Sequence, residues 1–127
     1  MDKREIDRLE GIAKIMGWKT THHENIDILE AFDDEFAETI TLGVDFDPFK
    51  RIDHAWRIVE KLRDTRIFNI NDVEQDDQMV YCVNFKYFDG FHAINYEVSH
   101  KSAPTAICLA ALKAVGIDVE TENEKAT

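Results

Sequence analysis

Residues 46–63 read FDPFKRIDHAWRIVEKLR, and the apolar positions of this segment recur with the spacing of an amphipathic helix. The expected buried stripe consists of Ala55, Ile58, Val59 and Leu62. Pro48 fixes its own φ and biases Asp47 away from helical dihedrals, so a turn should precede the helix. We expect Asp53 to cap the helix, because its carboxylate can accept backbone N–H bonds of the first turn.

Two further helices are predicted, one at each end of the chain. Residues 103–116 read APTAICLAALKAVG, and apolar side chains cover nearly the whole helix, so it should be largely buried. Ser102 suits its N-cap, Pro104 its first turn and Gly116 its end. Residues 2–17 form the other helix, which Gly17 should end.

Strands are expected between the second and third helices. Residues 79–88 read MVYCVNFKYF, and one alternating set of side chains is wholly apolar or aromatic. Asp89-Gly90 is a strong hairpin signal, so residues 91–98 should return antiparallel. A short strand is expected within residues 66–73. Residues 20–41 are ambiguous, and we interpret them mainly as a loop in an exposed, acidic insertion.

These elements predict an α+β fold with an antiparallel sheet packed between helices, an α/β/α sandwich. The length of 127 residues suits one domain, which we place at residues 1–119, followed by an acidic, frayed tail at 120–127. No apolar run reaches the roughly 18 residues of a membrane span, and the charged start lacks a signal peptide, so we expect a cytoplasmic protein. Cys82 and Cys108 should be buried free thiols.

Charge is distributed unevenly along the chain. The net charge is −11, yet residues 50–66 carry six basic and three acidic residues. Residues 20–49 hold nine acids and no Lys or Arg. An acidic surface repels phosphates, which argues against a nucleic-acid partner. The acidic residues could attract a basic partner or serve only solubility.

The order and spacing of several short motifs resemble a known family. They are Met16-Gly17-Trp18, Phe46-Asp47-Pro48, Ala55-Trp56 and the segment at 103–108, APTAIC. Together they are similar to the phage ABA sandwich family, small proteins carried by phages and prophages. The sequence departs at Phe49, where that family often has a small polar residue. The resemblance implies a sheet between helical layers and a bacterial host cell, and it implies no reaction.

The sequence contains none of the common catalytic motifs, such as a P-loop, HExxH or GxSxG. His22 and His23 could bind a metal, but no third ligand has suitable spacing, so we predict no metal and no cofactor. Asp45 and Asp47 form a DxD pattern, which leaves a hydrolase or nuclease as the least favoured hypothesis. We therefore favour a binding protein over an enzyme and predict no catalytic residues.

A ligand site is predicted at the turn before the middle helix, formed by Phe46, Asp47, Arg51 and Trp56. Trp56 has two interpretations. It can anchor the core, or it can stack on a planar ligand such as a nucleotide base if it is partly exposed.

Two functions follow from these features. The first is a small acidic phage or prophage accessory protein that binds a host protein without catalysis. The alternative is a small-molecule binder, such as a sponge for a nucleotide immune signal. Both are compatible with a homo-oligomer, and neither involves a membrane.

Overall fold

The structure is a computed structural model that describes residues 1–117, so the tail expected at 120–127 lies outside the described residues. The elements of the described part are α1 (Lys3–Met16), β1 (Lys19–His23), β2 (Ile28–Asp33), β3 (Glu38–Thr41), α2 (Ile52–Leu62), β4 (Ile67–Gln75), β5 (Gln78–Asp89), β6 (His92–His100) and α3 (Ala103–Ala114). All the strand pairs are antiparallel.

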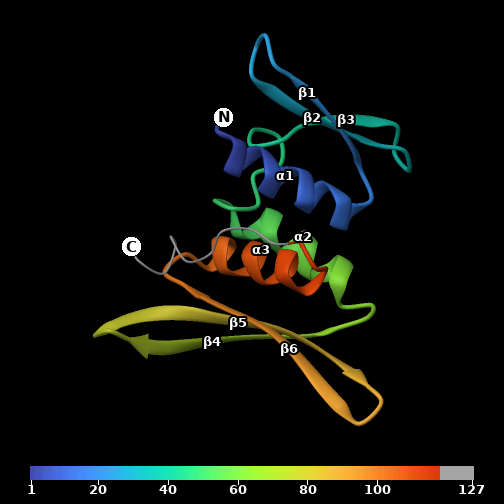
Figure 1. The fold of residues 1–127 in the computed structure, drawn as a ribbon. Helices are drawn as coiled ribbons and strands as arrows, with labels where there is room; N and C mark the ends of the chain where they lie inside the picture. Colours follow the sequence, from blue (N-terminus) through green and yellow to red (C-terminus); the bar gives the residue numbers. More distant parts are fainter. Residues whose placement is uncertain (118–127) are drawn as a thin grey trace.

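The helices lie between two small sheets (Figure 1). The sheet β1–β2–β3 is at one end of the molecule, beside α1, and the sheet β4–β5–β6 is at the other end, where α3 packs on β5 and β6. The expected α+β class with antiparallel strands in a layered fold is confirmed. The order of the layers differs from the expected one, because two sheets flank the helices instead of helices flanking one sheet.

The first sheet corrects the prediction of a loop at residues 20–41. The three strands pair in sequence order, with Thr20 opposite Ala31 and Ala31 opposite Ile40. Leu29, Ala31 and Ile40 are buried and hold this sheet on the helices. Asp27 closes the first hairpin turn and Ala37 the second, both with φ of 51°. Apart from the buried Asp33, the polar strand residues are exposed or half-buried, so apolar side chains are few in this segment.

The second sheet is a meander that follows the predicted alternation. Val83 and Phe85 of β5 are fully buried against the helices, and Val83 pairs with Val98 of β6. The opposite face is mixed, and on it the Asn84 amide donates to the Asn95 Oδ1 over 2.9 Å. β4 runs longer than expected, to Gln75, because only Asp76 and Asp77 form its turn, with φ of 52° and 62°. Two positive φ values suit the type I′ hairpin turn.

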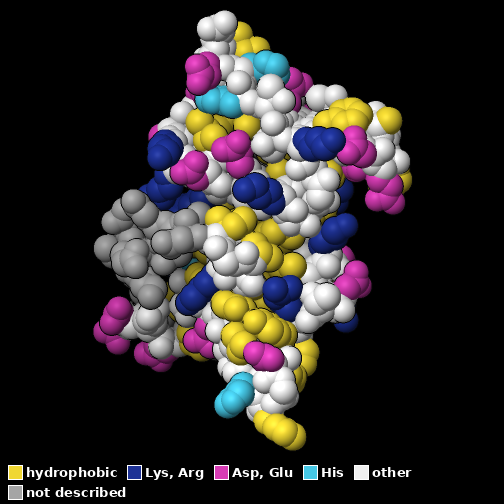
Figure 2. Space-filling view, turned by 45° about the vertical axis from the view of Figure 1, so that its right-hand side comes forward, with side chains coloured by type: hydrophobic (Ala, Val, Ile, Leu, Met, Phe, Trp, Pro, Cys, Tyr) yellow, Lys and Arg dark blue, Asp and Glu magenta, His cyan; other side chains and the backbone are white. Residues whose placement is uncertain are grey.

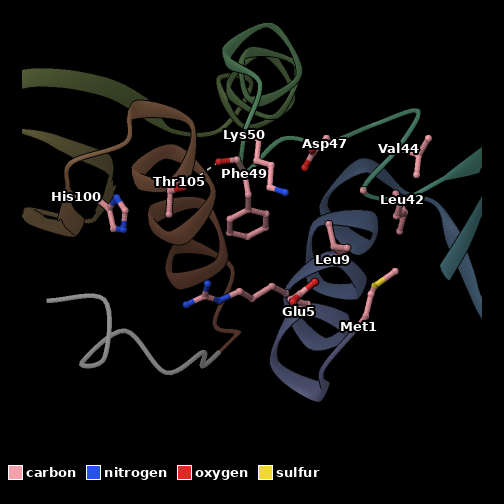
Figure 3. Close-up of a pocket in the computed structure, with 12 residues that line it drawn as sticks. Met1, Glu5, Leu9, Leu42, Val44, Asp47, Phe49, Lys50, His100 and Thr105 are labelled. Carbon is pink, nitrogen blue, oxygen red and sulfur yellow. Dashed lines mark hydrogen bonds between the residues drawn. The ribbon is translucent and has the colours of Figure 1, made fainter. Parts of the chain in front are cut away.

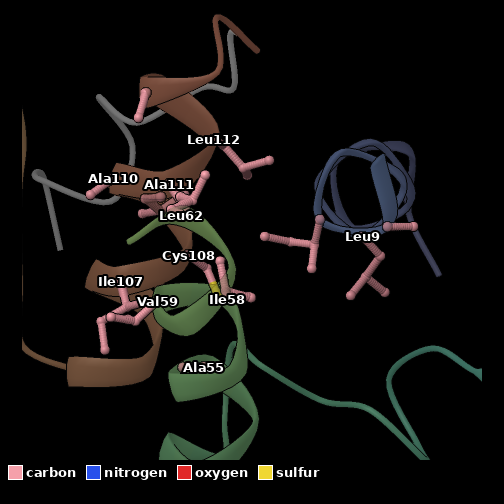
Figure 4. Packing of buried hydrophobic residues seen from close by; sticks show 14 of the residues in the cluster. Leu9, Ala55, Ile58, Val59, Leu62, Ile107, Cys108, Ala110, Ala111 and Leu112 are labelled. Atoms are coloured by element: carbon pink, nitrogen blue, oxygen red, sulfur yellow. The ribbon is translucent and has the colours of Figure 1, made fainter. Parts of the chain in front are cut away.

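The core lies where α1, α2 and α3 meet (Figure 4). Gly11 faces α3 so closely that a β-carbon there would stand 2.6 Å from Leu112 Cδ2 and 3.3 Å from Ile117 Cδ1. Glycine normally costs helix stability, so its presence inside α1 is explained by this close approach. On α3, Cys108 is fully buried and free, as predicted, whereas Cys82 of β5 is free but only half-buried.

The helix ends follow the sequence at α1 and α3. Gly17 adopts a left-handed φ of 81°, and the Trp18 amide donates to the Ala13 carbonyl over 2.8 Å. Ser102 caps α3 by accepting from the Thr105 amide over 3.4 Å. The prediction of an Asp53 cap is wrong. α2 begins at Ile52, so Asp53 lies inside its first turn, and Arg51 is at the N-cap without a side-chain capping bond.

Candidate functional site

Three of the four predicted ligand-binding residues lie in the turn before α2, where the Arg51 amide donates to the Asp47 carbonyl over 2.9 Å, but the four side chains have different surroundings. Phe46 is 1% exposed and belongs to the core. Its ring meets Trp18 edge-on and stacks on His54, with ring centroids 5.1 Å and 5.2 Å apart. The Arg57 guanidinium lies 5.0 Å from the centroid of the same ring. A ring enclosed in this way positions the surrounding loop instead of offering a face to a ligand.

Arg51 and Trp56 lie at the surface near α2. The Arg51 guanidinium donates to both carboxylate oxygens of Asp53, over 3.1 Å and 3.0 Å. This pair lowers the pKa of Asp53 from its usual value. Trp56 is 43% exposed and meets Phe68 of β4 edge-on at 5.6 Å. The interpretation of Trp56 as a core anchor is therefore wrong. Trp18, at 6% exposed, has that role.

Asp47, the fourth predicted residue, lines a pocket of about 500 Å³. The pocket lies between α1, the loop that leads into α2, and the start of α3 (Figure 3). Its lining residues are Met1, Glu5, Arg8, Leu9, Leu42, Gly43, Val44, Asp47, Phe49, Lys50, His100 and Thr105.

Hydrogen bonds hold the walls of this pocket in place. The Asp47 amide donates to His54 Nδ1 over 2.8 Å, which ties the loop to α2. The Thr105 hydroxyl donates to the Phe49 carbonyl over 2.9 Å, which ties the same loop to α3. The two bonds thus fix the loop to α2 and α3, and α1 completes the lining of a cavity between several elements, which is the usual setting of a small-molecule site.

The pocket carries charges of both signs. Arg8 stands over the ring of Phe49, with its Cζ 5.7 Å from the centroid. His100 accepts from the Ser102 amide at Nδ1 over 2.9 Å. Burial lowers the pKa of His100, and the nearby Arg8 and Lys101 lower it further. Arg8, Lys50 and His100 thus share the lining of the pocket with the carboxylates of Glu5 and Asp47.

A second candidate surface lies on the side of α2 and β4. We call it the Trp56 surface and define it as Ile52 and Trp56 of α2 with Phe68 and Ile70 of β4. Ile52 is 51% exposed and Ile70 is 37% exposed. Figure 2 shows hydrophobic side chains at the surface in the middle and lower parts of the molecule, with lysines and arginines beside them. Within residues 1–117, the outer edge of β4 pairs with no other strand.

Residues 1–117 contain no group of three or more His, Cys, Asp or Glu side chains placed to hold a metal ion. His22 Nε2 lies 3.2 Å from the Asp27 carboxylate, and His23 contacts Glu30. Asp45 accepts from the Thr41 amide over 3.0 Å, which is a turn-forming contact. Burial raises the pKa of the Cys108 thiol well above its usual value, so it is a poor nucleophile.

Comparison with known proteins identifies the family. The model of the phage ABA sandwich domain matches residues 12–112. The chain belongs to this family. Membership supports a phage protein and agrees with the α+β fold. Neither the curated proteins nor the solved structures include a match. In the part of this family member that the structure describes, no helix is long and apolar enough to cross a membrane.

Sequence reasoning missed most of the pocket. Arg8, Phe49, His100 and Thr105 come from three separate segments, and no local pattern links them. Phe49 gave one signal, since it replaces the small polar residue that the resemblance led us to expect. Sequence analysis singled out Trp56 of the Trp56 surface but not Phe68 and Ile70, because nothing in the sequence distinguishes them from other strand residues.

Proposed function

We propose that this phage protein acts by binding a protein of its bacterial host, in the host cytoplasm and without catalysis. The observation that carries the proposal is the exposure of Trp56 beside the unpaired edge of β4. Trp is among the residues that contribute most to protein interfaces, because its large ring loses much apolar surface on binding. Phe68 holds the ring from one side, so the indole is already ordered before a partner arrives.

The edge of β4 favours one mode of binding. An extended segment of a partner can add to a free strand edge, where main-chain hydrogen bonds give affinity and side-chain contacts give specificity. Charged residues protect the second half of β4, at Asp72 and Glu74. Its first half, from Ile67 to Ile70, has two exposed isoleucines and no charge. We therefore place the added strand along residues 67–70, next to Trp56.

The charge of the neighbouring segment indicates the chemistry of the partner. Residues 50–66 carry a net charge of +3 on a chain whose total is −11. A docking strand with acidic residues beside its apolar side chains would complement this segment, and binding should weaken as salt rises.

The alternative of a nucleotide stacked on Trp56 receives no support from the surroundings of this residue. Phe46 is buried, Arg51 is paired with Asp53, and neither is a ring partner of Trp56. A flat, open apolar surface suits a protein better than a small molecule, which needs a concave site.

Affinity capture from host lysate tests the proposal with three baits: the wild-type protein, Trp56→Ala and Phe36→Ala. Phe36 is the matched control, because it is 70% exposed and lies in the turn between β2 and β3. A specific host protein should be retained by the wild type and by Phe36→Ala and lost by Trp56→Ala. Equal capture by all three baits, or no capture at low and moderate salt, would contradict the proposal. So would gel filtration showing a wild-type dimer that Trp56→Ala converts to a monomer.

A further inference from the structure

The hairpin between β5 and β6 ends in an exposed aromatic tip that host binding at the Trp56 surface does not use. Phe91 is 105% exposed and Phe88 is 58% exposed, so most of both rings stays in water in the single chain. We propose that Phe91 of one copy of this protein inserts into the pocket beside α1 of a second copy. The binding site is then complete only when two copies meet.

The tip stands at the end of a two-stranded ribbon. β4 pairs with β5 only as far as Lys86, whereas β5 and β6 go on pairing to Asp89 and His92. In the part of the chain that the structure describes, this last stretch therefore has no third strand beside it. Figure 1 shows the hairpin extending away from the helices at the bottom of the molecule. Apolar rings at the end of such a ribbon are placed to reach a neighbouring molecule.

Contacts at the base of the ribbon hold it against the body of the protein. Tyr87 stacks on Tyr96 with ring centroids 6.0 Å apart, and the Arg66 guanidinium lies 5.4 Å from the centroid of Tyr87. Arg66 also donates to the Ala114 carbonyl of α3 over 3.1 Å. A two-stranded hairpin alone is only marginally stable in water. These contacts therefore order the tip before it binds, which lowers the entropic cost of association.

The tip cannot reach the pocket of its own chain. β6 begins next to Phe91, at His92, and ends at His100, which lines the pocket. A strand rises about 3.3 Å per residue, so the two ends of this nine-residue strand are about 26 Å apart. A contact between Phe91 and the pocket therefore joins two molecules. Because tip and pocket are different surfaces, the contact is heterologous.

The pocket suits an aromatic side chain in both size and lining. Its volume is about 500 Å³, whereas a cavity of roughly 150 Å³ is enough to hold benzene. Leu9 and Leu42 are buried in its wall, and Figure 3 shows the ring of Phe49 between them and the start of α3. The ring of Phe91 would meet apolar surface there, and the remaining space would admit the adjacent residues of the turn.

The charges of the chain make the attraction hydrophobic rather than ionic. The tip carries Lys86 and Asp89, whose formal charges cancel. Each copy has a net charge of −11, so like charge opposes association of two copies. Added salt screens this repulsion and should strengthen the contact. Binding of a host protein at the Trp56 surface should instead weaken with salt, which separates the two proposals.

Sedimentation equilibrium tests the proposal at about 1 mM protein and moderate salt, where even a weak contact of small area is populated. The variants are Phe91→Ala, Val44→Arg and Met79→Ala. Val44 lines the pocket and is 73% exposed, so an arginine there narrows the entrance without disturbing the core. Met79 is the matched control, because it is 62% exposed at the other end of β5.

The wild type and Met79→Ala should self-associate equally. Phe91→Ala and Val44→Arg should each associate about tenfold more weakly or less, the usual effect of losing a central aromatic contact. A mixture of these two variants gives the sharper result. The first keeps an intact pocket and the second an intact tip, so mixing should restore the association that neither shows alone.

Amide NMR shifts locate the contact. Those of Phe49 and Thr105 in labelled Phe91→Ala should move when unlabelled Val44→Arg is added, which places the tip in the pocket. The proposal is overturned by a monomeric wild type, by an equal loss in Met79→Ala, or by no recovery in the mixture. Trp56→Ala should self-associate like the wild type, since Trp56 belongs to neither tip nor pocket. This test and the capture of a host protein can therefore fail separately.

Discussion

The indole of Trp56 meets the ring of Phe68 edge-on, with centroids 5.6 Å apart, yet 43% of Trp56 stays exposed. Trp18 has the opposite environment, with 6% exposure between Phe46 and the Arg57 guanidinium. The two tryptophans thus separate a surface role from a core role. Trp18→Ala should lower the free energy of unfolding by about 3–5 kcal/mol, the usual cost of emptying a buried aromatic site.

Trp56→Ala should lower the free energy of unfolding by less, about 1–2 kcal/mol, because 43% of the Trp56 side chain is already exposed in the folded state. Urea unfolding followed by circular dichroism measures both variants. A large loss of stability in Trp56→Ala would mean that Trp56 has a structural role. The main argument for the Trp56 surface as a binding site would then fail.

The close contact of Gly11 with Leu112 makes the second prediction. Gly11→Ala should destabilise the protein by about 1–3 kcal/mol, because overpacking against α3 outweighs the better helix propensity of alanine. Lys14→Ala is the control on the same helix, where an exposed position should change stability little. An equally stable or more stable Gly11→Ala variant would show that α1 and α3 do not approach as described.

The capping residues give the third prediction. Ser102→Ala removes the acceptor for the Thr105 amide and should cost about 0.5–2 kcal/mol of unfolding free energy. Asp53→Ala removes only an exposed partner of Arg51, so its stability should stay close to that of the wild type. Denaturant midpoints of the two variants measure the difference, and a larger loss at Asp53 would restore it as the cap of α2.

His100 gives a prediction about pH. Its pKa is lowered by burial and by Arg8 and Lys101, so the folded state binds this proton less readily than the unfolded chain. The stability it contributes is complete above the ordinary histidine pKa of about 6.5 and is lost as the pH falls below that value. Protonation would also remove the Nδ1 acceptor of the Ser102 amide.

Urea midpoints between pH 7.5 and pH 5.5 should therefore fall less in His100→Gln than in the wild type. His92→Gln is the control, because His92 is exposed on β6 and should leave the wild-type slope unchanged. Identical slopes in the wild type and His100→Gln would contradict the environment described for this side chain.

The sequence predicted those helices and strands whose own residues form a recognisable local pattern. Each of these elements could be assigned from its own residues: α2 and α3 from the spacing of their apolar residues, the end of α1 from Gly17, and β5 from its alternating side chains. The first sheet was missed because its buried side chains are few and widely spaced, and because Ala37, rather than Gly or Asn, takes the positive φ in its second turn. The cap of α2 was misplaced because the turn after Pro48 ends at Arg51, two residues before the expected cap.

The candidate sites were less predictable than the fold. The Asp47 side of the pocket could be suggested from the turn before α2, but Arg8 and His100 join it only through packing of α1 and α3 against that turn. The exposure of Trp56 could not be predicted either. In the sequence it stands beside the buried stripe of α2. Its exposure depends on how β4 packs against α2, which a local pattern does not reveal.

The central claim is that a host protein binds at the Trp56 surface, and site-specific photo-crosslinking in host cells tests it most directly. A photoreactive phenylalanine derivative at position 70, with Trp56 intact, should crosslink to one host protein, and adding Trp56→Ala should reduce the product at least tenfold. The same derivative at position 36 is the control and should give no such product. A host protein that crosslinks from position 36 and not from position 70 would contradict the account.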